Sequence, residues 1–324
     1  MTKKSLAQGL RSLTFALLWS EQSFAYCRTT TCEPSWSCAQ HPEDCCIRDD
    51  NGCDTNGKPI AWPSSCVSFA VQKDGSLKRH ISADDLTALI EEAFAAWTSS
   101  TCSDGSTPSL RVENYGMAEC GVSEYNRCTG NANIWMFRDR NWTGSDAGGS
   151  GSGFDSSALA VTTVNFSVQS GLLYDADVEL NSDQAHFTLP NQAPIIDLKS
   201  IITHEAGHFL GFDHSPNEDA TMYFAYQPGE THARTLEPDD QAAICAAYPR
   251  DRELPGGESC EPRRGYSAEC HPEDDDIKDA CNGVGSGAGC QTATGGPGAP
   301  SGLGLLLGLA GIFGLSGRLI RRRV

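Results

Sequence analysis

Five residues within one short run, His204 to His214, have the types and the spacing that metal chemistry needs. His204 and His208 are four residues apart, so on an α-helix their imidazoles share one face and can bind the same ion. Glu205 is rotated by about 100° from His204 on a 3.6-residue period, which suits a carboxylate that acts as general base on a metal-bound water. The run therefore predicts a helix that carries a hydrolytic metal site.

A third ligand has to come from beyond this helix, because another residue on the same stripe would lie too far along the axis. Gly211 tolerates the left-handed conformation that commonly ends a helix, so the chain can turn there and bring His214 back to the ion. Three histidines leave one tetrahedral position open, which is the pattern of a catalytic zinc. We therefore expect one Zn²⁺ bound by His204, His208 and His214, with Glu205 as the catalytic base. A chance match on an ordinary amphipathic helix would not supply Gly211 and His214 as well.

The run Asp197–Ser215, followed by Ala220–Tyr223, resembles the metzincin metalloproteases and, within them, the matrixins. The resemblance extends from about Trp62 to Pro249. It implies that Met222 forms a turn beneath the zinc, as a structural floor and not as a ligand. It also implies an α+β fold: a twisted mixed β-sheet, a zinc-binding active-site helix and two further helices, with cysteine-rich appendages outside it.

Three other segments resemble matrixin features. Leu159–Phe166 looks like the edge strand along which the family lays its substrate, and Leu236–Tyr248 is similar to the closing helix, with Pro238 suited to its first position. Tyr223–Tyr226 resembles the wall of the main specificity pocket. The resemblance implies a zinc endopeptidase that hydrolyses protein or peptide substrates, with Glu205 activating the water. The alternative is a surface binding or adhesion module that keeps the zinc site without proteolysis.

Departures from the family concern further metal ligands. Vertebrate matrixins carry histidines for a structural zinc where this chain has Val161 and Asp177, so we expect no structural zinc. Phe224 stands where some metzincins have a tyrosine ligand, so we expect none here. Phe154-Asp155 resembles a calcium-holding loop, although a flexible linker with one solvated aspartate explains it equally well. The sequence leaves Ca²⁺ open.

The N-terminus has the pattern of an export signal. Basic residues at positions 3, 4 and 11 precede the apolar run Leu13–Trp19, and Ser23–Ala25 supplies small residues for cleavage after Ala25. All 15 cysteines follow that point, as expected in an oxidising compartment. The alternative, a short amphipathic helix of the folded protein, does not account for the cysteine-dense stretch that begins directly afterwards.

The cysteines predict a disulfide framework. Seven of them lie between Cys27 and Cys66, and since seven is odd, at least one should bridge to another region. Cys120-Gly121-Val122 superficially resembles the latency switch of the matrixins. Its position inside the expected catalytic domain favours a disulfide instead.

The C-terminus resembles an anchor. Gly302–Gly317 is apolar and is followed by Arg318 and by Arg321–Arg323, which is typical of a membrane segment with its basic end in the cytoplasm. The Gly289-Cys290 pair, a spacer, the apolar run and the arginines together resemble the sorting tails of myxobacterial surface proteins. We expect an exported protein, extracellular or at the cell surface, that is membrane-anchored or processed at this tail. A formal net charge of -18 disfavours nucleic acid as a partner.

Composition and periodicity set the organisation of the chain. Ser82 begins a predicted helix with a capping pattern that Asp85 completes, and the helix buries one apolar face. Ile195, Ile196, Leu198, Ile201 and Ile202 are expected to pack the zinc helix. His186 is the remaining histidine that could approach the cleft. The expected segments are a signal peptide (1–25), a cysteine-rich segment (26–58), the zinc metalloprotease domain (59–250), a cysteine-containing stalk and linker (251–301), and the transmembrane or sorting tail (302–324).

Overall fold

The computed structural model describes residues 25–123, 125–126, 129–144, 153–269 and 307–308 of the 324-residue chain. The expected signal peptide except Ala25, most of the stalk and almost all of the tail lie outside these ranges, as do Cys128, Cys270, Cys281 and Cys290. Within the described ranges, no helix combines the length and the apolar character that crossing a bilayer requires.

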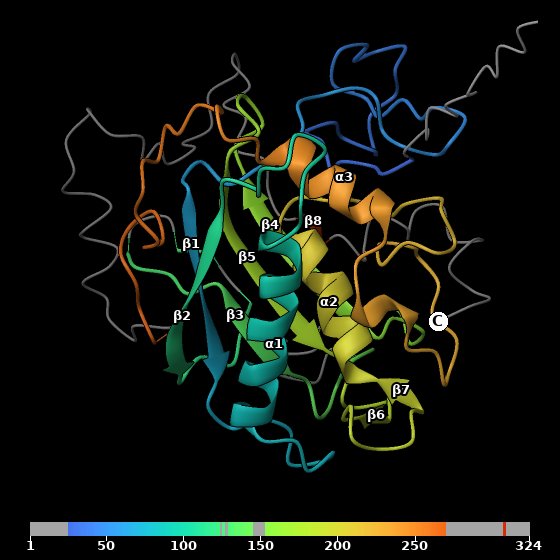
Figure 1. Ribbon diagram of the computed structural model, residues 1–324, viewed down its shortest axis with the longest axis vertical. Coiled ribbons are helices and arrows are strands. Elements are labelled where there is room, and N and C mark those ends of the chain that lie inside the picture. The colour runs from blue at the N-terminus through green and yellow to red at the C-terminus, as the bar shows by residue number, and fades with distance from the viewer. Residues whose placement is uncertain (1–24, 124, 127–128, 145–152, 270–306, 309–324) are drawn as a thin grey trace, which may run out of the picture.

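One mixed sheet forms the body of the molecule, and helices α1 and α2 lie against one of its faces (Figure 1). Its strand order is β2-β1-β3-β5-β4-β8, and β6 and β7 make a separate pair. The expected α+β fold is confirmed. The elements are β1 (Cys66–Gln72), α1 (Ala83–Thr98), β2 (Arg111–Ala118), β3 (Ile134–Phe137), β4 (Ala160–Phe166), β5 (Leu173–Leu180), β6 (Phe187–Thr188), β7 (Ile196–Asp197), α2 (Leu198–Phe209), the 3₁₀ turn η1 (His232–Arg234), α3 (Pro238–Ala247) and β8 (Leu307–Gly308).

Helix α1 begins and packs as its sequence predicts. The Ser82 side chain accepts a hydrogen bond from the backbone of Asp85, and the Asp85 side chain accepts one from the Ser82 backbone, which completes the capping box. The apolar stripe is buried throughout, and the Trp97 indole donates to the Thr203 carbonyl of α2 at 2.9 Å. Helix α1 therefore packs against α2 and helps to fix its position. Its buried stripe comprises Leu86, Leu89, Ile90, Ala93, Phe94 and Trp97.

Helix α2 buries most of the apolar residues expected to pack it. Leu198, Ile201 and Ile202 lie in the core, whereas Ile195 is 49% exposed and Ile196 belongs to strand β7. The prediction was therefore wrong for Ile195, because the helix begins only at Leu198 and the preceding residues run in extended conformation.

Strand β4 is the last long strand at the side of the sheet opposite β2. It runs antiparallel to β5, whereas the β1–β2, β1–β3 and β3–β5 pairs are parallel. It lies beside α2, which places it along the metal-binding run. On its outer side, Thr163 and Val164 pair antiparallel with Gly308 and Leu307 of β8. Strand β8 of the same chain thus pairs with the strand along which the substrate is expected to bind.

Five disulfides connect described residues. Three lie within the N-terminal segment, namely Cys27–Cys53, Cys32–Cys46 and Cys38–Cys45. The seventh cysteine bridges outward from Cys66 to Cys260, which confirms the inference from the odd number. The fifth disulfide, Cys102–Cys245, ties the segment after α1 to α3. Cys120 is disulfide-bonded too, as its position in the catalytic region predicted.

Replacing both cysteines of the Cys66–Cys260 bridge by serine should destabilise the fold more than the same change at Cys38–Cys45. The bridges span 194 and 7 residues of sequence, but the Cys102–Cys245 bridge shortens the first loop to about 50 residues, so loop entropy alone makes it worth about 2 kcal/mol more. Urea unfolding of the two double variants measures the difference. Equal losses would mean that loop closure is not what these bridges contribute.

Candidate active site

The three histidines of the run converge as predicted. The side chains of His204 and His208 project from successive turns of α2, and the chain returns to bring His214 beside them. One ring nitrogen from each lies within 4.8 Å of the others, and the His208 and His214 Nε2 atoms are 3.2 Å apart. Two nitrogens bound to one tetrahedral zinc at its usual bond length lie about 3.3 Å apart. The separation therefore fits a shared ion.

Backbone carbonyls fix which nitrogen of each ring can bind a metal. His204 Nδ1 lies 2.7 Å from the Thr221 carbonyl oxygen, and His208 Nδ1 lies 2.8 Å from that of Phe212. Because a carbonyl oxygen only accepts, each Nδ1 must carry the proton and donate it. Both Nε2 atoms then keep a lone pair directed toward the cluster. A divalent cation satisfies these lone pairs, and an outer partner on the other nitrogen is typical of metal-binding histidines.

The rings are also held neutral, which is the form that binds metal. Burial, with a further contribution from the neighbouring His208, lowers the pKa of His204 to about 3. Burial and the proximity of His214 lower the pKa of His208 to about 3 as well. The pKa of His214 falls well below its ordinary value for the same reasons, burial first and His204 second. At neutral pH no proton competes with a cation for the cluster.

Gly211 makes the turn that the sequence assigns to it. Helix α2 ends at Phe209, and Gly211 has φ of +93°, the left-handed region that glycine adopts without strain. A Cβ there would lie 2.6 Å from the Ile60 carbonyl oxygen, so the close approach of the Ile60 backbone also requires glycine. The turn directs the chain toward His214.

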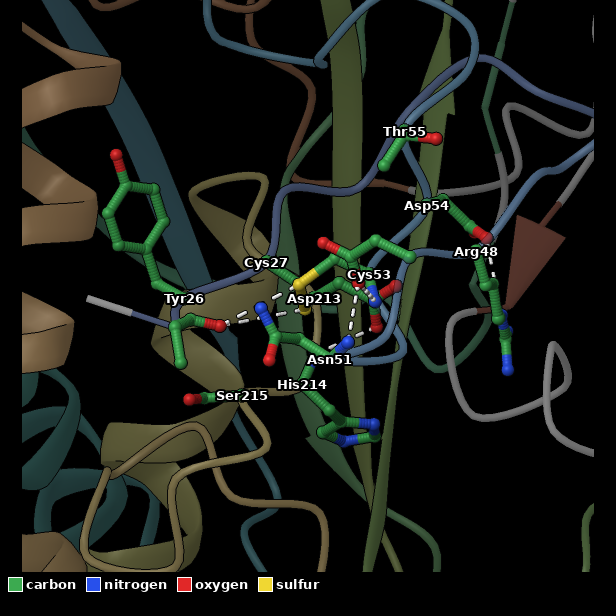
Figure 2. Close-up of a disulfide and its surroundings, with 12 residues drawn as sticks. Tyr26, Cys27, Arg48, Asn51, Cys53, Asp54, Thr55, Asp213, His214 and Ser215 are labelled. Carbon is green, nitrogen blue, oxygen red and sulfur yellow. Dashed lines mark hydrogen bonds and ion pairs between the residues drawn. A yellow bond between two sulfur atoms is a disulfide. The ribbon is translucent and has the colours of Figure 1, made fainter. Parts of the chain in front are cut away.

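The N-terminal segment, which the sequence suggested as a cap on the catalytic domain, stabilises this returning chain. Asp213 donates its backbone N–H to the Cys27 carbonyl at 3.2 Å, and Thr29 donates to the Gly211 carbonyl at 3.1 Å. Figure 2 shows the Cys27–Cys53 disulfide beside Asp213 and His214. The segment thus forms a short antiparallel bridge with the loop that carries the third histidine.

Met222 lies directly under α2. A Cβ added to Gly207, in the middle of the histidine run, would fall on the Met222 sulfur and 2.8 Å from a ring carbon of Trp97. The helix and the Met222 turn therefore meet with no room for even a methyl group. This matches the floor position that the matrixin resemblance implies for Met222.

Two aspartates at the start of α3 fix the Met222 turn, and sequence reasoning missed their role. Asp240 accepts the backbone N–H groups of Thr221 at 2.8 Å and Met222 at 3.1 Å. Asp239 accepts the Ser215 hydroxyl at 2.7 Å and the Tyr26 backbone N–H at 3.1 Å. From sequence alone these carboxylates are explained by the favourable interaction of acidic residues with a helix N-terminus, so nothing in the pattern predicted the long-range bonds.

Glu205 lies beside the histidine cluster on the face of α2 that meets β4. Its side chain is 5% exposed, and burial raises its pKa to about 7, while a hydrogen bond from Thr162 acts in the opposite direction. Thr162 Oγ1 is 2.5 Å from Glu205 Oε2. The sequence predicted this glutamate at the site but gave no signal for Thr162, which is 43 residues away along the chain.

Other residues that the sequence associates with metal binding lie outside the histidine cluster. His186 Nδ1 is 3.3 Å from an Arg79 guanidinium nitrogen, and His186 is not part of the histidine cluster. Asp177 is buried in β5, where its carboxylate accepts the Ile134 backbone N–H at 2.9 Å. That no structural zinc binds near Val161 and Asp177 stays a prediction, as does the open question of Ca²⁺ at Asp155.

Comparison with known proteins agrees with this geometry. The family model for matrixin matches residues 131–249, which include every element from β3 to α3 together with the histidine cluster. Residues 131–249 therefore resemble the matrixins. Among curated proteins, "Metalloendoproteinase 1-MMP" of Arabidopsis thaliana is 25% identical over 203 residues, which make up 60% of this chain and 45% of that relative. The chain spans about half the length of that relative. These findings support a matrixin-like fold for this part of the chain.

Gly207→Ala should destabilise the matrixin-like domain although alanine is the better helix former. Overpacking against Met222 and Trp97 costs about 1–3 kcal/mol, which outweighs the gain of up to about 1 kcal/mol in helix propensity. Thermal unfolding measures the change, with Gly144→Ala as control, since a Cβ at Gly144 meets nothing within 4 Å. If the two variants unfold together, the close packing under α2 is refuted.

Proposed function

We propose that this protein is an exported zinc endopeptidase in which His204, His208 and His214 hold one catalytic Zn²⁺ and Glu205 is the general base. The observation that carries the proposal is the joint geometry of the site: two imidazoles with their Nε2 lone pairs fixed by backbone carbonyls, a third imidazole 3.2 Å from one of them, and a buried carboxylate alongside. A zinc ion bound there supplies Lewis-acid chemistry, lowering the pKa of water and polarising a carbonyl oxygen.

The residues of this chain supply the proton transfers. With Oε2 of Glu205 bonded to Thr162, Oε1 is the oxygen free to accept a proton from the attacking water. The same carboxyl group then returns a proton to the leaving amine. Burial raises the pKa of Glu205 above its ordinary value, which favours the carboxyl form that returns the proton.

Strand β4 is the proposed platform for the substrate. An extended peptide binds a sheet edge by backbone hydrogen bonds, and β4 runs beside α2 at the outer side of the sheet. The pairing of Leu307–Gly308 with Thr163 and Val164 supports the ability of this edge to accept an antiparallel strand. A substrate would use the same backbone groups, so it would have to displace that pairing.

The wall from Tyr223 to Tyr226 is the proposed specificity element, with preference for an apolar side chain after the scissile bond. The Tyr226 hydroxyl accepts the Asp197 backbone N–H at 2.8 Å and donates to the Glu230 carbonyl at 2.8 Å. Asp197 in turn caps α2 and pairs with Arg234. This network supports a wall held in fixed position relative to the metal-binding helix.

Export is supported by the disulfides, which form and persist in oxidising compartments. A signal peptide at residues 1–25 and an anchoring or sorting tail at 302–324 belong to the proposal.

Wild-type protein should contain one zinc per chain, and His208→Ala should lose it because only two of three imidazoles remain. Elemental analysis of purified, folded protein measures the content. His186→Ala, which changes a histidine outside the cluster, should keep the metal. Stoichiometric zinc in the His208→Ala variant would refute the ligand assignment.

Glu205→Gln should keep zinc and lose peptide cleavage by about 10²–10⁴-fold, the usual contribution of general acid–base catalysis. Cleavage of a peptide library, followed by mass spectrometry, measures the loss. Glu91→Gln, at an exposed carboxylate of α1 that accepts from Asn114, serves as control. An adhesion module with an idle zinc site would instead leave every peptide intact in the wild type.

A further inference from the structure

A threonine hydroxyl on the substrate strand contacts the proposed base. Thr162 Oγ1 lies 2.5 Å from Glu205 Oε2, and the two residues are 1% and 5% exposed. Thr162 belongs to β4, whereas Glu205 belongs to α2. The bond therefore links the sheet edge to the carboxylate inside the protein, away from solvent.

The chemistry of the two groups fixes the direction of this bond. An ionised carboxylate only accepts hydrogen bonds, so the threonine hydroxyl must donate to it. Hydrogen bonds to a charged acceptor are roughly twice as strong as neutral ones, and burial strengthens them further. Threonine is branched at Cβ, which restricts rotation about its first side-chain bond. The hydroxyl is thus a donor whose place is set by the backbone of β4.

We propose that Thr162 is a positioning residue that holds Glu205 by Oε2 and so keeps Oε1 directed at the water to be deprotonated. This inference rests on the proposed function. Without the hydroxyl, the carboxylate can rotate about its terminal bond, and a fraction of the molecules present the base in an unproductive orientation. Strand β4 then has two tasks, since the strand proposed to bind the substrate backbone also orients the base.

Thr162→Val removes the hydroxyl and keeps the branched shape. We expect kcat to fall by roughly 10- to 100-fold, which is the loss of one hydrogen bond to a charged group. KM should stay within about twofold and the zinc content should not change, because neither the backbone of β4 nor the histidines are altered. Thr162→Ser retains the donor and should recover kcat to within about threefold of wild type.

Thr98→Val is the matched control, because the Thr98 hydroxyl donates to the Phe94 carbonyl inside α1 at 2.8 Å, away from the cluster. It should leave kcat, KM and zinc content at their wild-type values. A Thr162→Val enzyme with wild-type kcat would overturn the proposal. So would a Thr162→Ser enzyme as slow as Thr162→Val, or a loss of zinc in both, since each result would assign Thr162 a purely structural role.

Crystal structures of wild type and Thr162→Val give a readout that does not need activity. We expect one Glu205 carboxylate orientation in the wild type and two or more in the variant. A single, unchanged orientation in the variant refutes positioning, whether or not the protein cleaves peptides. If wild type binds zinc but cleaves no peptide, the proposed function fails by itself, and the crystallographic comparison still decides the role of Thr162.

Discussion

Two backbone carbonyls, those of Thr221 and Phe212, hold His204 and His208 in the tautomer that leaves Nε2 able to bind a metal. Each accepts the Nδ1 proton of one imidazole and so directs the opposite nitrogen toward the cluster. Both carbonyls belong to the chain that follows α2, so the fold must bring that chain back under the helix and keep it there. Several features of the structure can be understood as ways of meeting this constraint.

The return path is held at each stage by a different interaction. Gly211 makes the turn after α2. The Cys27 carbonyl then accepts the backbone N–H of Asp213, and the Asp240 carboxylate accepts the backbone N–H of Thr221. The close contact of Met222 with Gly207 then sets the distance between the turn and the helix. Backbone hydrogen bonds carry most of this path, so its geometry depends little on the identity of the exposed side chains.

The sequence predicted the local part of this arrangement. The histidine spacing, the turn at Gly211 and the capping box at Ser82 all follow from helix periodicity and from the conformational range of glycine, which act within a few residues. The odd cysteine count predicted that one bridge must leave the first segment, and it is Cys66 that does so. These signals are strong because each rests on a constraint within one element or on simple counting.

The non-local part could not be predicted in this way. Thr162 reaches Glu205 across 43 residues, and Asp240 reaches Thr221 across 19, with no periodic pattern to announce either contact. Threonine is common in strands and aspartate is common at a helix start, so neither residue type at these positions indicates a long-range contact. The same holds for Ile195, which matches the apolar pattern ahead of α2 yet lies exposed because the helix starts later.

The hydrogen bond from Asp213 to the Cys27 carbonyl connects the loop of His214 to the Cys27–Cys53 disulfide. Cys27 is bonded to Cys53, and its carbonyl supports the residue next to His214, so the third imidazole is set in place by a segment that oxidation itself holds. Under the proposed function, closure of the Cys27–Cys53 disulfide therefore favours binding of the ion. In a chain folded under reducing conditions, His204 and His208 would keep their places on α2, whereas the loop that carries His214 would lack the support of the Cys27–Cys53 disulfide.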